Sequence, residues 1–196
     1  MTFIQSDTEP LPASSNIPDS PDDSTQKALD QKEILSFWFG VPLAPDAEYK
    51  ERRKLWFGKS ESVDQAIQRQ FSDIYESAKA GECKSWQSTP QGCLALIVLL
   101  DQFPRNMFRG TPDSFATDQK ALKVTQRAIA QGFDQELPPV QRMFIYLPLE
   151  HSENRDHQQQ AVTLFQALAD EHQEVNDTYI YALKHQAVIE RFGRFP

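Results

Sequence analysis

The chain has 196 residues, and its 13 Phe, 3 Trp and 5 Tyr supply enough apolar bulk for one packed domain. Its net charge is −8, from 28 acidic against 20 basic residues, which argues against a nucleic-acid-binding protein. No apolar run approaches the roughly 20 residues that span a bilayer, so we expect no membrane partner either.

Residues 1–26 differ in composition from the rest of the chain. They contain four prolines, five serines, five acidic residues and no Lys or Arg. So few apolar residues cannot offset the entropy lost on ordering, which predicts a disordered tail at 1–26 and a single all-helical domain at 27–196. The tail has neither the apolar core of a secretory signal nor the Arg-rich pattern of a transit peptide, so we expect a cytoplasmic protein.

From residue 27 onward, apolar residues recur at the steps of three and four that are typical of helices. Gly follows an aromatic residue in FWFG (37–40), WFG (56–58) and RFG (191–193), where we expect helix ends. The segment 61–80 predicts an amphipathic helix, and Pro112 in 112–131 is expected in the first turn of another. The remaining predicted helices are 139–147, 157–170 and 174–192.

The segment 93–100 (CLALIVLL) is apolar all round, which fits a buried strand or a buried helix. Because no partner strand is visible elsewhere, we predict a central helix. Short links then predict antiparallel pairs: 61–80 with 90–102, 112–131 with 138–147, and 157–170 with 174–192. Their spacing of about 50 residues exceeds the 34 of a standard tetratricopeptide repeat, so a divergent array and a helical bundle both fit.

Three polar clusters follow strongly apolar segments. The first contains Asp101, Gln102, Arg105 and Asn106, and its Pro104 is expected to end or bend the helix. The second contains Glu150, His151, Ser152 and Glu153. The third contains His185, which falls on an apolar face with Val175, Ala182, Ile189 and Phe192, and then Arg191 and Arg194. Convergence of the three clusters would create a polar pocket.

Each cluster also has a purely structural interpretation. Asp101 and Arg105 would form a local ion pair, His185 would be a core residue, and Glu150 and Glu153 would brace helix packing. We expect His157 and His172 to face solvent, the three Trp residues to anchor the core, and Cys83 and Cys93 to be buried and reduced.

No familiar catalytic or cofactor motif is present. Glu150 and His151 are adjacent and would diverge by about 100° on a helix, unlike the ligands of helical metal sites. The zinc motif His-Glu-x-x-His, Gly-rich phosphate loops, nucleophile elbows and dinucleotide fingerprints are also missing. We therefore predict no metal and no cofactor.

Several long phrases resemble a bacterial family known as domain of unknown function 924. They are ILSFWFG (34–40), LALIVLLDQFPRNMFRGTP (94–112), YLPLEHSEN (146–154) and RFGRFP (191–196). The resemblance implies an all-helical, tetratricopeptide-repeat-like right-handed array, but no activity. Members continue past the final Phe-Pro with a His-Arg-Asn phrase, so a pocket that those residues help to build would be incomplete here. The family's hallmark polar positions match Asp101, Gln102, Arg105, Asn106, Glu150, His151, Ser152, Glu153, His185, Arg191 and Arg194.

Three functions remain open at this point. In the first, the protein binds a polar or anionic small ligand or a peptide end, held by Arg105, Arg191 and Arg194 with help from Gln102 and Asn106. Asp101, Glu150 and Glu153 would orient those arginines. In the second, an enzyme uses His185 or His151 as a general base, oriented by Glu150 or Glu153. In the third, the helical array is a protein-interaction module. The sequence does not indicate an oligomeric state.

Overall fold

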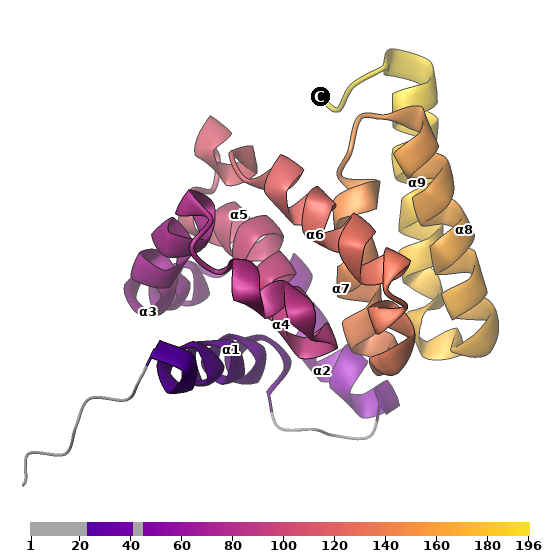
Figure 1. Ribbon diagram of the computed structural model, residues 1–196. Helices are drawn as coiled ribbons and strands as arrows, with labels where there is room; N and C mark the ends of the chain where they lie inside the picture. The colour runs from indigo at the N-terminus through magenta and orange to yellow at the C-terminus, as the bar shows by residue number, and fades with distance from the viewer. Residues whose placement is uncertain (1–22, 41–44) are drawn as a thin grey trace, which may run out of the picture.

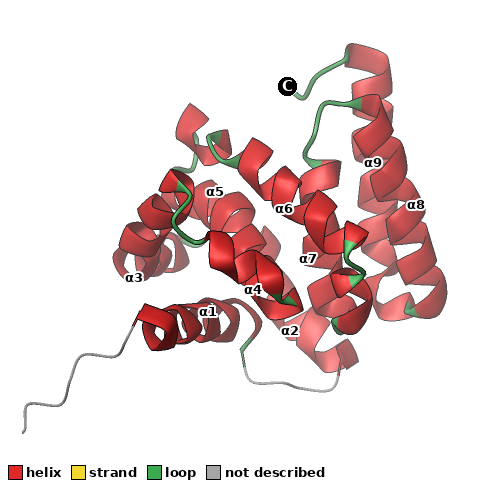
Figure 2. Cartoon of the chain, viewed as in Figure 1, coloured by secondary structure: helices red, strands yellow, loops and turns green. Residues whose placement is uncertain are grey.

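The computed structural model describes residues 23–40 and 45–196, and within these ranges the chain forms helices joined by short turns, without a β-strand (Figure 2). The all-helical prediction is confirmed. The α-helices are α1 (Asp23–Phe39), α2 (Pro45–Phe57), α3 (Glu61–Ala80), α4 (Pro90–Ile97), α5 (Phe103–Met107), α6 (Asp118–Ala130), α7 (Pro139–Glu150), α8 (Arg155–Glu171) and α9 (Asn176–Phe192). The predicted tail lies mostly outside the described residues, although α1 already includes residues 23–26.

Side-chain caps and glycines explain where several helices begin and end. Ser60 caps α3, Thr89 caps α4 ahead of Pro90, and Asn154 accepts two backbone hydrogen bonds at the start of α8. Gly193 ends α9 with a φ of 73°, as its position after Arg-Phe predicts. Gly58, which follows α2, does not have a positive φ like Gly193. Glycine is required there because a Cβ would lie 2.2 Å from the carbonyl oxygen of Lys54.

The apolar segment 93–100 is the centre of the molecule. Its residues are buried, and α4 packs against α1, α6 and α7 (Figure 1). Next to it, the rings of Trp38 and Trp56 both pack edge-on against Phe144, and the Trp56 indole donates a 2.9 Å hydrogen bond to the carbonyl of Trp38. Trp38, Trp56 and Trp86 are all buried, which confirms them as core anchors.

The helix does not end before Pro104, which excludes one of the two expected outcomes, an end or a bend. A π-helical turn, η2 (Val98–Gln102), joins α4 directly to α5, and Phe103 keeps right-handed helical angles. Pro104 has no N–H to offer the carbonyl four residues earlier. That carbonyl, on Leu100, instead accepts a 2.5 Å hydrogen bond from the hydroxyl of Thr117. The π-helical turn and the hydrogen bond from Thr117 together allow the helix to continue through Pro104.

The predicted helix pairs form in part. Helices α8 and α9 lie antiparallel along one side of the molecule, and α6 packs on α7 (Figure 1). Helix α3 packs mainly on α5 and on η2, so it meets the C-terminal part of its predicted partner 90–102. Residues 112–131 are not one helix, because a 3-10 turn, η3 (Pro112–Phe115), precedes α6. Phe115 and Phe192, both predicted on buried faces, are 61% and 63% exposed. The tetratricopeptide-like arrangement stays a prediction.

Candidate functional site

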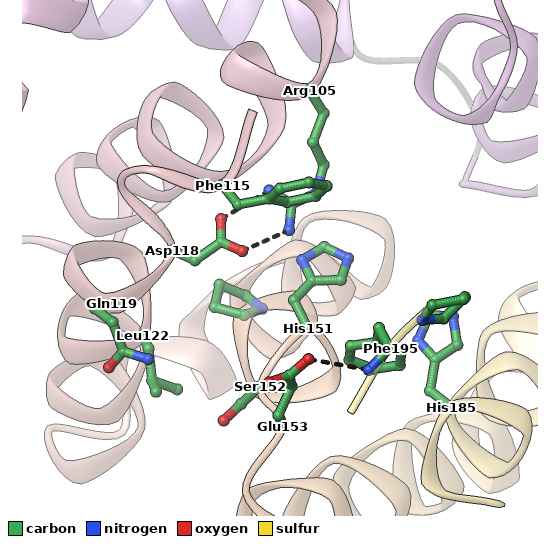
Figure 3. Close-up of a pocket in the computed structure, with 12 residues that line it drawn as sticks. Arg105, Phe115, Asp118, Gln119, Leu122, His151, Ser152, Glu153, His185 and Phe195 are labelled. Carbon is green, nitrogen blue, oxygen red and sulfur yellow. Dashed lines mark hydrogen bonds and ion pairs between the residues drawn. The ribbon is translucent and has the colours of Figure 1, made fainter. Parts of the chain in front are cut away.

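A cavity of about 520 Å³ opens between the start of α6, the end of α7 and the final residues of the chain (Figure 3). Arg105 enters it from α5, Asp118 from α6, His151 from the C-terminal end of α7, and His185 from α9. Two smaller hollows adjoin it, of about 180 Å³ and 340 Å³. His151 borders all three spaces, which together are here called the cleft.

The π-helical turn places Asp101 beneath this cleft, fully buried. Its Oδ1 lies 2.8 Å from Nδ1 of His151 and 3.5 Å from Nη1 of Arg105, and its Oδ2 accepts a 2.6 Å hydrogen bond from the side chain of Gln102. Burial alone would raise the pKa of the Asp101 carboxyl, but Arg105, His151 and Gln102 outweigh it and lower the pKa to about 2. Asp101 is therefore a permanent buried anion at neutral pH.

Arg105 is held by acids on two sides. Its guanidinium makes two hydrogen bonds to Asp118, of 2.9 and 3.0 Å, and a third of 2.5 Å to the backbone carbonyl of Asp101 (Figure 3). The ring centroid of Phe115 lies 5.4 Å from its Cζ. Burial raises the pKa of the Asp118 carboxyl, although Arg105 opposes the shift. These contacts engage both terminal nitrogens of the guanidinium, which leaves Arg105 fewer donors for an anionic ligand.

His151 is the most central of the predicted site residues. Its Nδ1 faces Asp101, its side chain is 19% exposed, and no residue in the described ranges forms a hydrogen bond with its Nε2. The carboxylate on Nδ1 favours the tautomer in which that nitrogen carries the proton. Nε2 is then free to accept or deliver a proton at the cavity.

His185 forms a second histidine–carboxylate pair. Its Nδ1 lies 2.7 Å from Oε1 of Glu150, a residue that is only 3% exposed. The ring of Phe195 packs edge-on against the His185 imidazole, at 5.3 Å between centroids. Glu150 therefore pairs with a histidine of α9, and not with one of the arginines that it was expected to orient.

The rim of the cavity contains contacts that the sequence does not predict. Glu153 accepts a 2.9 Å hydrogen bond from the backbone N–H of Phe195, so the last residues of the chain fold back over the cavity (Figure 3). His157, predicted to face solvent, lies with its Nδ1 2.8 Å from the hydroxyl of Ser152. Asp118 is also absent from the site residues predicted from the sequence, although an acid in the first turn of a helix is a favourable and recognisable placement.

The structure brings together residues from all three predicted clusters, but not every residue. Asn106 lies at the 180 Å³ hollow and donates a 2.8 Å hydrogen bond to Asp64, which also holds Arg109. Arg191 and Arg194 are exposed beyond the end of the cleft and do not line the cavity. The predicted anion clamp of three arginines is therefore not assembled in this arrangement. The residues that do meet at the cleft are Asp101, Gln102, Arg105, Asn106, Glu150, His151, Ser152, Glu153 and His185.

The donor groups of the cleft do not form a metal-binding set. Within residues 23–40 and 45–196, no three His, Cys, Asp or Glu side chains are grouped as metal ligands. Both cysteines are buried and unpaired, and burial raises the pKa of the Cys93 thiol to about 11. None of the helices that the structure describes is long and apolar enough to cross a membrane.

The fold and site define an all-helical protein with a polar cleft built around two histidine–carboxylate pairs. The chain belongs to the family described as bacterial protein of unknown function DUF924, whose model matches residues 34–196. It is similar to a solved protein of unknown function from Agrobacterium tumefaciens, with 35% sequence identity and a TM-score of 0.76. That likeness covers 87% of this chain and 88% of the other. No curated protein matches the chain.

Proposed function

We propose that the cleft is an active site that binds a small polar molecule and in which His151 moves a proton to or from it. The observation that carries this proposal is the 2.8 Å contact between Nδ1 of His151 and a fully buried carboxylate, behind an open cavity of about 520 Å³. A histidine oriented in this way presents Nε2 to a bound molecule, as general acid–base catalysis requires.

Asp101 supports this role in two ways. It fixes the orientation of the imidazole, and its negative charge stabilises the imidazolium that forms when His151 accepts a proton. Because Arg105 and Gln102 also contact Asp101, the carboxylate stays ionised and does not compete with His151 for the proton. His151 is the catalytic residue in this proposal, whereas Asp101 is a positioning residue.

The charge of the cleft favours a neutral or cationic ligand over an anionic one. Arg105 is already paired with Asp118 and Asp101, and Glu150 and Glu153 add two further acids around the same space. An anion entering this space would meet more negative than free positive charge. We therefore replace the anionic ligand suggested by the sequence with a polar ligand that is uncharged or carries a positive group.

The test combines binding with turnover in the full chain. Thermal shift identifies stabilising compounds in a panel of small polar molecules, and chromogenic carboxylic esters, phosphate esters and amides report turnover. We expect His151→Gln to lower turnover by about 100-fold or more without changing the fold. His172→Gln is the control, because His172 lies outside the cleft beside Glu171 and Glu174. Equal turnover in wild type and His151→Gln would refute the proposal.

A further inference from the structure

The hollow of about 340 Å³, here called the inner pocket, lies between α2, α7 and α9. It shares His151 and His185 with the main cavity, so the two imidazoles stand between the two spaces. Its walls combine apolar surface, from Phe57, Leu147 and Tyr181, with the carboxylates of Glu150 and Asp177.

The two carboxylates of the inner pocket are not equivalent. Both oxygens of Asp177 have donors: the hydroxyl of Tyr49 binds Oδ1, and Nε of Arg53 binds Oδ2 at 2.9 Å. Arg53 also lies 5.9 Å from the ring centroid of Phe57. The charges of Arg53 and Asp177 thus balance each other, and both oxygens of Asp177 already have a donor.

Glu150 is different because half of its carboxylate is unused. Oε1 lies 2.7 Å from the His185 imidazole, whereas Oε2 is buried and has no hydrogen-bond partner. A buried carboxylate oxygen without a donor is uncommon, because the lost hydration is not replaced. No lysine or arginine side chain in the described ranges pairs with Glu150 to supply that donor.

We infer that the inner pocket binds the ammonium group of an amine, with Oε2 of Glu150 as the acceptor. An ammonium group supplies both the missing hydrogen-bond donor and the positive charge that the carboxylate lacks. The apolar wall then covers the hydrocarbon part next to the nitrogen. The inference rests on the proposed function, in which the cleft binds a small polar molecule. It narrows the class of that molecule to small amines.

Three probes of nearly equal size test whether the pocket selects a positive charge: benzylamine, benzyl alcohol and benzoate. Their dissociation constants for the full chain are measured by NMR titration and calorimetry. We expect benzylamine to bind at least tenfold more tightly than benzyl alcohol, which is a neutral donor, and benzoate not to bind. Equal binding of benzylamine and benzyl alcohol, or no binding of benzylamine, overturns the inference.

Matched variants locate the site. Glu150→Gln should weaken benzylamine at least tenfold, whereas Glu171→Gln, which alters an exposed acid that lines neither cavity, should leave its affinity unchanged. If Glu150→Gln does not fold, a crystal structure of the wild-type protein with benzylamine replaces the titration. An amine nitrogen placed away from Glu150 in that structure would refute the inference. His151→Gln should still bind benzylamine, so loss of turnover in that variant and loss of the ammonium site are separate results.

Discussion

Nδ1 of His151 lies 2.8 Å from Oδ1 of Asp101, although 50 positions separate the two residues in the chain. The contact joins the end of α7 to the π-helical turn that follows α4, and it connects the centre of the core to the floor of the cleft. Since Asp101 also contacts Arg105, one buried carboxylate organises both the catalytic candidate and the principal charge of the site.

Replacing Asp101 by Asn should destabilise the protein as well as impair the site. The substitution removes the anion and leaves a buried polar network with fewer partners, for which we expect a loss of about 3 kcal/mol in the free energy of unfolding. Urea unfolding of Asp101→Asn and wild type measures the difference. Glu153→Gln is the control, since its carboxylate lies at the rim. A change below about 0.5 kcal/mol, the level of ordinary surface substitutions, would contradict a structural role for the carboxylate.

The lowered pKa of Asp101 predicts a loss of stability in acid. Because its pKa is about 2 in the folded chain and 3.8 without the fold, the stabilisation is complete above pH 3.8 and disappears as the pH falls towards 2. The difference corresponds to about 2 kcal/mol. Urea midpoints between pH 2 and pH 6 measure it, and Asp101→Asn should lack this component.

The ionisation of Asp118 should affect stability in the opposite sense to that of Asp101, and at higher pH. Burial raises its pKa above 3.8, so protonation of Asp118 relieves an unfavourable buried charge before Asp101 begins to titrate. Asp118→Asn should therefore change the pH dependence above 3.8 and retain the loss below it. A profile identical in wild type and both variants would show that neither carboxyl titrates differently in the folded chain.

The cysteines should be unreactive until the protein unfolds. Cys83 and Cys93 are 3% and 0% exposed, and burial raises the pKa of both thiols, which lowers the thiolate fraction at neutral pH. Labelling with a thiol reagent at pH 8 should follow the rate of unfolding, and both thiols should react at once in denaturant. Rapid labelling of the native protein would show that α4 is not the sealed centre of the fold.

The sequence predicts the helices better than the site because periodicity reports burial directly. The buried face of α3 repeats every three or four residues, at Ile67, Phe71, Tyr75 and Ala78. The π-helical turn escapes this reasoning, since Pro104 normally breaks a helix and its compensation comes from Thr117, which is distant in sequence.

The predicted polar residues converge where they follow buried helices and do not converge at the chain's surface. Asp101 and His151 each end or follow an apolar segment that leads to the core, so both lie beneath the same cleft. Arg191 lies in the last turn of α9 and Arg194 follows it, and neither lines the cavity, although Phe195 and Pro196 do. Sequence position alone does not distinguish these cases, because the direction of a side chain depends on how far each helix extends.

The hydroxyl of Thr117 should be essential to the passage of the helix through Pro104. Thr117→Val keeps the shape of the side chain but leaves the buried carbonyl of Leu100 without the donor that replaces the missing N–H, for which we expect a loss of about 2 kcal/mol. Thr117→Ser retains the hydroxyl and should be less destabilised than Thr117→Val in urea unfolding. If both variants lose the same stability, the methyl group and not the hydrogen bond matters. Because Asp101 and Gln102 belong to the same turn, the valine variant should also weaken any ligand that depends on His151.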